Sequence, residues 1–425
     1  MEEWKEYTIG DIAGVKGGKR LPKGVNLVKE PNTHPYIRVR DLNSKKYLEL
    51  DNTFEYVDDK TQQLIARYIV NAGDIIISIV GTIGLIAIIG ESLNNANLTE
   101  NCVKLVDIRR INRDYLYYYL ISDWGKQEIE KGIVGAVQAK LPIKNIQAIT
   151  IKAPCEETQR RIASILSSLD DKIEVNRRIN ENLEAQAQAL FKSWFVDFEP
   201  FRDGEFVESE LGMIPKGWRV YKMDELVDWI GGYSYKGNEL QESTTAMATI
   251  KNFERNGGFK INGFKEIVPS SKAKHEQFLK KFDVIIAHTD LTQNADIIGN
   301  PALILHFGKY ERLIMSMDLV KVKSKSDYIT YGLLYCFFSD ARFKSHALGY
   351  VNGTTVLHLS KKAIPEYKLA LPHDLSILAI FCKTFDSIFA KEAEMMEETD
   401  LLATLRDTLL PRLMSGELKV NEVGL

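Results

Sequence analysis

Few residues in this chain have the types and spacing that catalysis requires. The seven histidines show neither His-x-His nor His-Glu-x-x-His spacing, so no metal site is expected. The sequence GTIG at residues 81–84 lacks the Lys-Ser/Thr pair of a phosphate-binding P-loop. No Asn-Pro-Pro-Tyr motif or glycine-rich methyl-donor loop is present, and ELK at residues 417–419 lacks the upstream acidic partner of a nuclease. The sequence therefore predicts a recognition or scaffold protein without catalytic residues.

Basic residues are the functional groups that the sequence concentrates. Residues 156–199 hold six basic and nine acidic residues and residues 373–425 hold five and ten, so a total charge of −3 leaves +5 elsewhere. Basic clusters on loops and short strands favour contact with phosphate, although a solvated surface rich in lysine would show the same pattern. The candidates for DNA binding lie in residues 16–46 and 251–281 and are Lys16, Lys19, Arg20, Lys23, Arg38, Arg40, Lys45, Lys251, Arg255, Lys260, Lys265, Lys272 and Lys274.

The composition predicts a globular protein with more than one domain. At 425 residues, two or three domains are expected, and 45% apolar residues suffice for well-packed cores. The most apolar run, residues 75–89, is too short for a bilayer and contains glycines, so two buried strands and no membrane contact are predicted. The cysteines form no CxxC pair, which fits a reducing, cytoplasmic location; they are Cys102, Cys155, Cys336 and Cys382.

The chain repeats itself once, with one copy in each half. WKEYTIGDI at residues 4–12 reappears as WRVYKMDEL at residues 218–226, YIR at 36–38 resembles TIK at 249–251, and GDIII at 73–77 resembles FDVII at 282–286. Four further pairs lie 218 positions apart: Gly135 and Gly353, Leu141 and Leu359, Ile146 and Ile364, and Pro154 and Pro372. A long helical pattern follows each copy. The repeat unit is therefore a globular module followed by a helix, which indicates one duplication and not a solenoid.

Within each module the pattern is mainly β. Residues 75–80 and 85–89 are β-branched runs split by the turn at 81–84, which predicts a hairpin, with a counterpart at 284–286 and 302–305. One short helix is predicted over residues 113–131 and again over 328–346. Aromatic residues at helical spacing in the first of these are interpreted as core residues in preference to base-stacking groups; they are Tyr115, Tyr117, Tyr118 and Tyr119.

Two long helices follow the modules. The first begins after Pro154, and the second begins after Pro372 and ends near Pro411 and Gly416. Alternating steps of three and four residues define a coiled-coil seam on each helix. The seam residues are Ile162, Leu166, Leu169, Ile173, Asn176, Asn180, Leu183, Ala187, Leu190 and Trp194 in the first helix, and Phe381, Phe385, Ile388, Glu392, Met395, Thr399, Leu402, Leu405 and Leu409 in the second.

Polar residues near the middle of both seams favour antiparallel pairing, because they then meet and fix the register at a cost in stability. The order module–helix–module–helix then places the modules at opposite ends with pseudo-twofold symmetry. The predicted fold class is α+β: two mixed, mainly β domains separated by two long antiparallel coiled-coil helices. The predicted boundaries are 1–155 for the first domain, 156–199 for the first helical spacer, 200–372 for the second domain and 373–425 for the second spacer.

The chain resembles the specificity subunits of type I restriction–modification systems over nearly its whole length. The motifs that carry the resemblance are GDIIIS (73–78), GTIG (81–84), LP (141–142), ETQRRI (157–162), QALFKSWFVDF (188–198), LGMIPKGW (211–218) and LLPRLMSGE (409–417). The second half departs from the pattern at two places. Ile377 stands opposite Gln159, and DLTQ at residues 290–293 replaces GTIG.

The resemblance implies two target-recognition domains, each of which reads one half of a bipartite, asymmetric target in double-stranded DNA. It also implies that the helices recruit two modification subunits, which methylate adenine with S-adenosylmethionine, and that restriction (motor-nuclease) subunits using ATP and Mg join the complex. No cofactor is expected in this chain itself. A helix of about 37 residues is roughly 55 Å long. That length is enough to hold two readers about 34–36 Å apart, one turn of DNA.

Two other classes of function stay open at this point. A structural coiled-coil adaptor whose globular ends bind protein would lack the steep dependence of DNA affinity on salt that phosphate contacts give. A self-sufficient nuclease or methyltransferase would act on DNA without a partner subunit.

Overall fold

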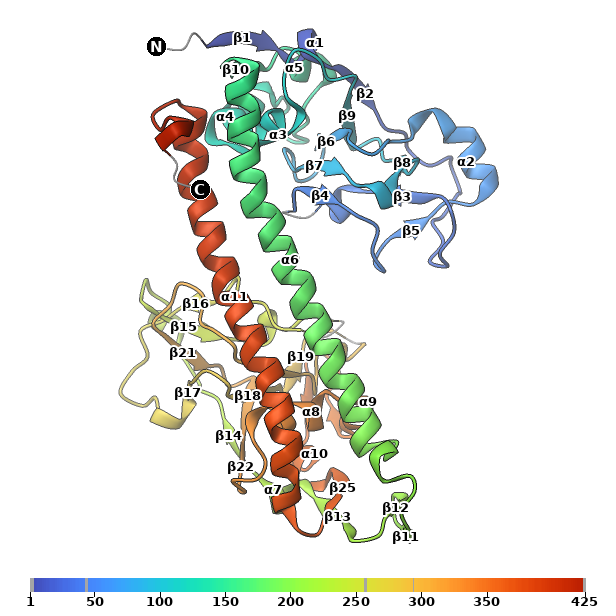
Figure 1. Cartoon of the computed structure of the whole chain (residues 1–425), viewed down its shortest axis with the longest axis vertical. Coiled ribbons are helices and arrows are strands. Elements are labelled where there is room, and N and C mark those ends of the chain that lie inside the picture. The colour runs from blue at the N-terminus through green and yellow to red at the C-terminus, as the bar shows by residue number, and fades with distance from the viewer. Residues whose placement is uncertain (1–3, 43–44, 256–257, 293, 423–425) are drawn as a thin grey trace. The chain divides into compact units, whose positions relative to one another are not determined.

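The computed structural model describes residues 4–42, 45–255, 258–292 and 294–422. The chain divides into two compact units: unit 1 comprises Met1–Ile173 and Leu402–Leu425, and unit 2 comprises Glu174–Leu401. Each unit contains one module together with part of both long helices (Figure 1). The domain boundaries drawn from the sequence, with separate helical spacers, stay a prediction.

Unit 1 contains the first module and one end of each long helix. Its strands are β1 (Lys5–Thr8), β2 (Gly14–Gly17), β3 (Pro35–Ile37), β4 (Tyr47–Leu48), β5 (Glu55–Tyr56), β6 (Ile75–Ser78), β7 (Ile86–Ile89), β8 (Asn97–Leu98), β9 (Cys102–Val106) and β10 (Thr150–Ala153). Its helices are α1 (Ile9–Ile12), α2 (Asp59–Ile65), α3 (Arg113–Ile121), α4 (Asp123–Gly132), α5 (Ile143–Gln147), the start of α6 (Glu156–Phe195) and the end of α11 (Leu378–Met414).

Unit 2 contains the second module and the remainder of α6 and α11. Its strands are β11 (Phe206–Ser209), β12 (Gly212–Pro215), β13 (Trp218–Lys222), β14 (Val227–Gly231), β15 (Thr245–Ala248), β16 (Lys265–Glu266), β17 (Phe278–Leu279), β18 (Val284–Ala287), β19 (Thr289–Asp290), β20 (Pro301–Leu303), β21 (Arg312–Met315), β22 (Leu319–Ser324), β23 (Val351–Asn352), β24 (Leu357–Leu359) and β25 (Lys368–Pro372). Its other helices are α7 (Met223–Leu226), α8 (Tyr331–Ser339), α9 (Ala341–Leu348) and α10 (Ala363–Glu366).

The two modules share the strand order of the first four strands of the main sheet, to which unit 1 adds β4. The main sheet has the order β2-β9-β6-β7-β4 in unit 1 and β14-β22-β18-β20 in unit 2. A second sheet contains one parallel pair in each unit, β3 with β8 and β15 with β21. Strand β1 pairs antiparallel with β10, and the corresponding strand β13, which follows the β11–β12 hairpin, pairs antiparallel with β25, so each module closes where its long helix begins. This topology confirms the internal repeat and the α+β class.

The predicted hairpins are confirmed in both modules. Strand β6 pairs antiparallel with β7, and β18 pairs antiparallel with β20. Every residue of β6, β7 and β18 is buried, because helices or the second sheet cover both faces. Complete burial explains why these strands have continuous apolar runs instead of an alternating pattern.

The short helix predicted in each module is wrong in one respect, because the structure has two helices in its place. Residues 113–131 form α3 and α4, which meet at Ser122, whose side chain accepts a hydrogen bond from Gly125 at the start of α4. In unit 2, Asp340 caps α9 in the same way and separates it from α8. These capping side chains offer the backbone an alternative to helix continuation. The interpretation of the tyrosines as core residues is confirmed, since all four are buried.

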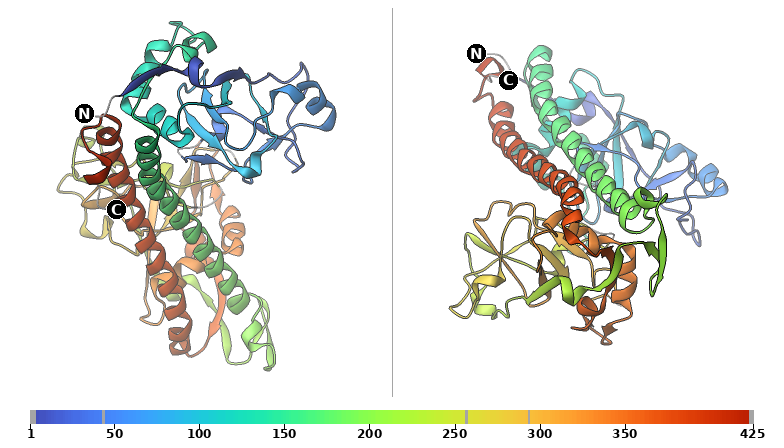
Figure 2. Two further views of the ribbon diagram at one scale, coloured as in Figure 1. Left: turned by 45° about the horizontal axis from the view of Figure 1, so that its top comes forward. Right: turned by 60° about the horizontal axis from the view of Figure 1, so that its bottom comes forward.

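The long helices pair antiparallel. In unit 1, the Arg406 guanidinium on α11 lies 2.7 Å from the Asp170 carboxylate on α6. In unit 2, Asn176 Nδ2 donates a hydrogen bond to Glu398 at 2.8 Å, and the rings of Trp194 and Phe381 are 4.9 Å apart. Partner numbers fall on α11 as residue numbers rise on α6, and the two helices lie side by side within each unit (Figure 2).

The ends and seam of α11 differ in detail from the prediction. The helix begins at Leu378, after a 3-10 turn over Leu375–Ile377, and it continues through Pro411 to Met414. Pro411 lacks the donor for one helical hydrogen bond and its ring crowds the carbonyl of Asp407, yet the helix continues to Met414. Most predicted seam residues are buried or half-buried, but Leu405 is 39% exposed and the neighbouring Arg406 faces α6 instead. A straight helix drifts against a strict seven-residue repeat, which accounts for the shift by one position.

Replacing Asp170 is expected to destabilise unit 1. Its carboxylate accepts hydrogen bonds from both Arg406 and the Tyr118 hydroxyl, and only 11% of its side chain is exposed. Asp170→Ala would leave the Arg406 guanidinium, which is 24% exposed, without this partner, at a cost of about 2–3 kcal/mol. Thermal unfolding measures the effect, with Asp171→Ala at an exposed neighbouring position as the matched control. Equal melting temperatures for the two variants would contradict a structural role for this ion pair.

Candidate DNA interface

The first basic cluster contains three lysines that are available to a ligand. Lys16, Lys19 and Lys23 are exposed, and none of them has an ion-pair partner among the described residues. Lys19 lies over the ring of Tyr68, with its ammonium 5.6 Å from the ring centroid. Arg20 is 80% exposed and pairs with Glu100 at 2.5 Å. Ammonium groups on flexible stems are suited to phosphate contacts, which position a protein on DNA without reading its sequence.

Arg38 and Arg40 differ in burial and in how many ion pairs they form within the protein. The side chain of Arg38 is 19% exposed and contacts both Asp41 and Glu55, so it holds the turn that follows β3. Arg40 is 60% exposed, and its guanidinium lies 3.1 Å from Glu55. Lys45 is half-buried and takes part in an interaction within the protein. Of these three, Arg40 has the greatest freedom to contact a ligand.

The second basic cluster also contains three available lysines. Lys251, Lys272 and Lys274 are exposed, and no ion pair engages them within the described part of unit 2. The other three candidates have partners: Arg255 lies 4.0 Å from Asp296, Lys260 lies 3.7 Å from Glu254, and the Lys265 ammonium lies 6.0 Å from the Tyr235 ring centroid. Each module therefore presents a small set of lysines beside a larger set of partnered basic residues.

The interpretation of the sequence passed over further exposed cations near the end of each module. Lys140 and Lys144 in unit 1, and Lys361 and Lys362 in unit 2, are exposed and have no ion-pair partner among the described residues. Lys144 and Lys362 are 218 residues apart, the same spacing as the repeat. The repeat spacing therefore marks this pair of lysines in the sequence, although they lie outside the segments in which basic residues are dense.

Lys46 belongs to the first basic run but has a structural role. Its side chain is 4% exposed, and its ammonium donates to Ser167 on α6 at 2.6 Å and lies 3.4 Å from Asp114 on α3. Tyr118 on α3 also donates to Asp170 on α6, at 2.5 Å. These interactions attach the basic loop of unit 1 to the long helix.

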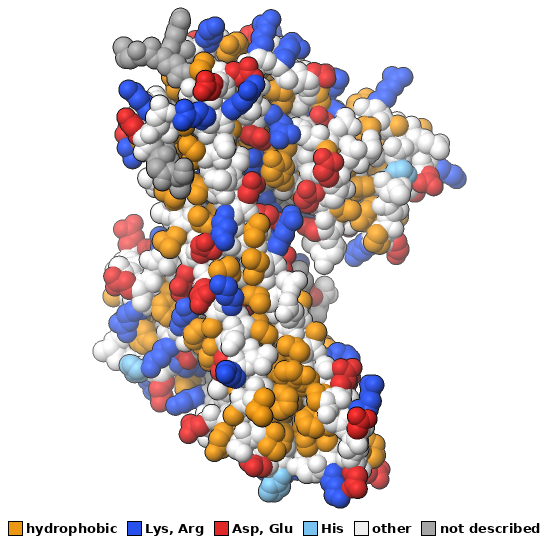
Figure 3. Space-filling view, viewed as in Figure 1, with side chains coloured by type: hydrophobic (Ala, Val, Ile, Leu, Met, Phe, Trp, Pro, Cys, Tyr) orange, Lys and Arg blue, Asp and Glu red, His pale blue; other side chains and the backbone are white. Residues whose placement is uncertain are grey.

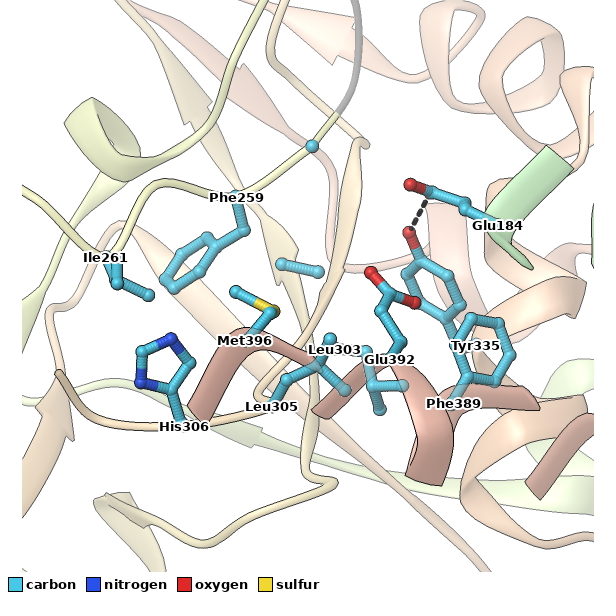
Figure 4. A pocket seen from close by; sticks show the side chains of 12 residues that line it. Glu184, Phe259, Ile261, Leu303, Leu305, His306, Tyr335, Phe389, Glu392 and Met396 are labelled. Atoms are coloured by element: carbon cyan, nitrogen blue, oxygen red, sulfur yellow. Dashed lines mark hydrogen bonds between the residues drawn. The ribbon is translucent and has the colours of Figure 1, made fainter. Parts of the chain in front are cut away.

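A small acidic cavity lies beside α6 and α11 in unit 2 (Figure 4). The Tyr335 hydroxyl donates to Glu184 at 2.9 Å, and Glu392 lies on the same side of the cavity. Burial, together with the negative charge of Glu184, raises the pKa of Glu392 to about 8. The cavity volume is about 60 Å³, which is enough for a few ordered water molecules, since each needs roughly 10–15 Å³ of such volume. Such a space is too small for a nucleotide or for S-adenosylmethionine.

Two further findings concern the described residues as a whole. They contain no group of three or more His, Cys, Asp or Glu side chains placed to hold a metal ion. None of the helices described has both the length and the apolar character needed to cross a membrane.

Comparisons with known proteins agree on one class. The profile of the family described as type I restriction modification DNA specificity domain matches residues 1–185. The MjaIX specificity subunit of Methanocaldococcus jannaschii is 26% identical, over 99% of this chain and 95% of the relative. The HindI specificity subunit of Haemophilus influenzae is 26% identical, over 98% of this chain and all of the relative. A crystal structure of the type I S subunit from M. genitalium shares the fold, with a TM-score of 0.52, 16% identity and coverage of 97% and 96%.

The repeated α+β module, the paired long helices and these comparisons define a DNA-specificity protein with a recognition role and not a catalytic one. More particularly, residues 1–185 match the type I restriction modification DNA specificity domain, and the chain is similar over nearly its whole length to type I restriction–modification specificity subunits.

Removing the available lysines of one module is expected to weaken DNA binding without unfolding the chain. Removal of one phosphate-binding lysine should lower the slope of log affinity against log salt by about 0.9, so changing Lys16, Lys19 and Lys23 to Ala should flatten it measurably. Arg38→Ala is expected to lower the melting temperature instead, because it breaks partly buried ion pairs. Binding to a DNA duplex at several salt concentrations tests both. Unchanged affinity and slope in the lysine variant would contradict the assignment.

The stability of unit 2 is expected to depend on the protonation of Glu392. The folded pKa of about 8 lies above the usual value of 4.5, so folding favours the protonated carboxyl. This contribution is complete below pH 4.5 and is lost progressively as the pH rises to about 8. Glu392→Gln, which stays neutral, should gain in melting temperature relative to the unsubstituted chain between pH 6 and pH 8.5. Exposed Glu394→Gln is the control, and identical pH profiles for all three proteins would disprove the expectation.

Proposed function

We propose that this chain reads a bipartite, asymmetric target in double-stranded DNA, with one module on each half of the target. The observation that carries the proposal is the duplication: one chain contains two modules that share the order of four strands in the main sheet and have different loops. Because the two modules have similar folds, we expect both to bind a duplex in the same orientation. Their loop side chains differ, so we expect them to prefer different bases. Two unlike readers in one chain therefore fit a target with two unlike halves.

The lysines support the electrostatic part of the proposal. Both modules present exposed lysines on loops and short strands, while the segments that contain the long helices have a net negative charge. Phosphate contacts supply most of the affinity for DNA of any sequence and bring the reader onto the duplex. The net charge of −3 is consistent with DNA binding because the positive charge is concentrated on the modules.

The long helices support recruitment of two modification subunits, which would methylate adenine. On α11, Ile380 is 75% exposed and Leu401 is 72% exposed, although apolar side chains on a helix are normally buried. Figure 3 shows hydrophobic side chains gathered over the part of α11 that belongs to unit 2. Exposed apolar patches of this kind favour contact with a partner protein. We assign S-adenosylmethionine to the modification subunits, and ATP and Mg to restriction subunits that join the complex.

Exchange of one module tests the proposal. Residues 1–155 would be replaced by the first module of a related specificity subunit, and methylated adenines would be mapped across a genome in the presence of a modification partner. We expect one half of the target to change while the other half and the gap stay the same. The purified chain without a partner should produce no methylation. A change in both halves, or methylation by the chain alone, would contradict the proposal.

A further inference from the structure

In unit 1, the turn between β6 and β7 and a second hairpin form one ribbon. Lys140 pairs with Val134 on one side and with Val80 on the other, and the Leu141 amide donates to Ile79 at 3.0 Å. The hairpin turns at Gly135, whose φ of +97° and close approach to Gln138 leave no room for a Cβ atom. Residues 134–140 are all exposed. We call this element, residues 79–84 with 134–140, the tip ribbon of unit 1.

Unit 2 contains the same ribbon. Strand β24 pairs with β23 on one side and with β19 on the other. Gly353, 218 residues after Gly135, has a φ of +109°, and a Cβ atom there would collide with the carbonyl oxygen of Val356. We call β19, β23 and β24, with residues 291–292 and 294–300 of the loop that follows β19, the tip ribbon of unit 2.

Different side chains hold the two ribbons in shape. In unit 1, buried Ser78 donates its hydroxyl hydrogen to Thr82 and accepts from the Leu85 amide. In unit 2, the Asp290 carboxylate accepts from the amides of Thr292, Ile297 and Ile298, at 2.8, 2.6 and 3.2 Å. The Lys344 ammonium donates to three carbonyl oxygens of the same loop and to the side chain of Asn300. Both ribbons are therefore fixed before any ligand arrives.

The exposed side chains of the two ribbons differ where the backbone corresponds. Val137 at the tip in unit 1 is 98% exposed, whereas its counterpart 218 residues later is Thr355. The loop of unit 2 adds Leu291, which is 61% exposed. Holding an apolar side chain rigidly in water has no benefit for stability, so these residues fit contact with a ligand.

We propose that the tip ribbon of each unit is the element that enters a groove of the duplex and reads base edges. A two-stranded β-ribbon fits the major groove, where each base pair presents a distinct set of donors, acceptors and methyl groups. Apolar tips such as Val137 match the thymine methyl group. Lys140 and Lys144, or Lys361 and Lys362, stand where the ribbon joins the module and would contact the phosphates that border the groove.

This inference rests on the proposed function and assigns affinity for DNA and preference for bases to different parts of each module. The lysines of residues 16–46 and 251–281 would set affinity for any sequence, and the tip ribbons would set the preference for particular bases. A rigid backbone with variable side chains suits that task, because a reader held in place loses little conformational entropy on binding.

Substitution at the tip tests the inference in the assembled complex of this chain with a modification subunit. The double variant Val137→Ala/Gln138→Ala would be assayed for methylation of a randomised DNA library. We expect the half of the target read by unit 1 to lose about tenfold or more of its preference at one or two positions, while the other half keeps its preference. Leu64→Ala is the matched control, because Leu64 is 72% exposed and lies on α2, outside the ribbon. Thr355→Ala/Leu291→Ala should affect only the other half.

The outcomes separate this inference from the proposed function. If the unsubstituted complex shows no sequence preference, the proposed function fails. If it shows a bipartite preference that both double variants retain in full, the tip ribbons are not the readers and the inference is overturned. Melting temperatures equal to that of Leu64→Ala exclude unfolding as the cause of a change. Lys140→Ala should reduce affinity on all sequences and flatten the salt slope by about 0.9 without altering the preference.

Discussion

The antiparallel packing of α6 with α11 is the constraint on which the rest of the structure depends. Each module closes through an antiparallel strand pair, β1 with β10 and β13 with β25, and a long helix leaves from that point. Neither long helix can bury its apolar face alone. In each unit, α6 and α11 therefore pack against each other and against one helix of the module. Tyrosines on the module helices fasten this packing: Tyr118 donates to Asp170, and Tyr335 donates to Glu184, both on α6.

The same architecture is stabilised by different chemistry in the two units. Asp170 faces the cation of Arg406 in unit 1, whereas Glu184 and Glu392 are two acids with one cavity between them in unit 2. The first turn of α3 is held by Gln159, which accepts from the Asn112 amide at 2.8 Å. In unit 2, Asp386 holds the first turn of α8 by accepting from Thr330 and Gly332. Ile377, which corresponds to Gln159 in the repeat, is 44% exposed and has no side-chain amide with which to hold this turn. Asp386 on α11 takes that role in unit 2.

Much of the fold was predictable because it depends on patterns that a sequence displays directly. The repeat, the buried hairpins and the long helices follow from spacing and from apolar runs. The break at Ser122 was missed because an aromatic helical pattern continues on both sides of it, and only the cap and the packing of Gly125 against Tyr119 end the helix. The basic clusters could be located from sequence, but the commitment of Arg38 to Asp41 and Glu55, and of Lys46 to Ser167, depends on contacts between distant segments. The tip ribbons were missed because each unites segments that are distant in the sequence, so the turn motif at residues 81–84 did not indicate that it lies beside residues 134–140.

The loop that distinguishes the tip ribbon of unit 2 bears on how such a protein can change over generations. Between paired residues of the central hairpin there are eight residues in unit 1, 78–85, and fourteen in unit 2, 287–300. The longer loop is held by its own Asp290 and by Lys344, so its growth leaves the sheet register unaltered. If each module reads one half of a target, as proposed above, a duplicated chain starts with two identical readers and hence with a palindromic target. Insertions confined to one self-supporting loop allow one copy to acquire a new half-target while the other copy keeps its own, which converts symmetry in the ancestor into asymmetry in the descendant.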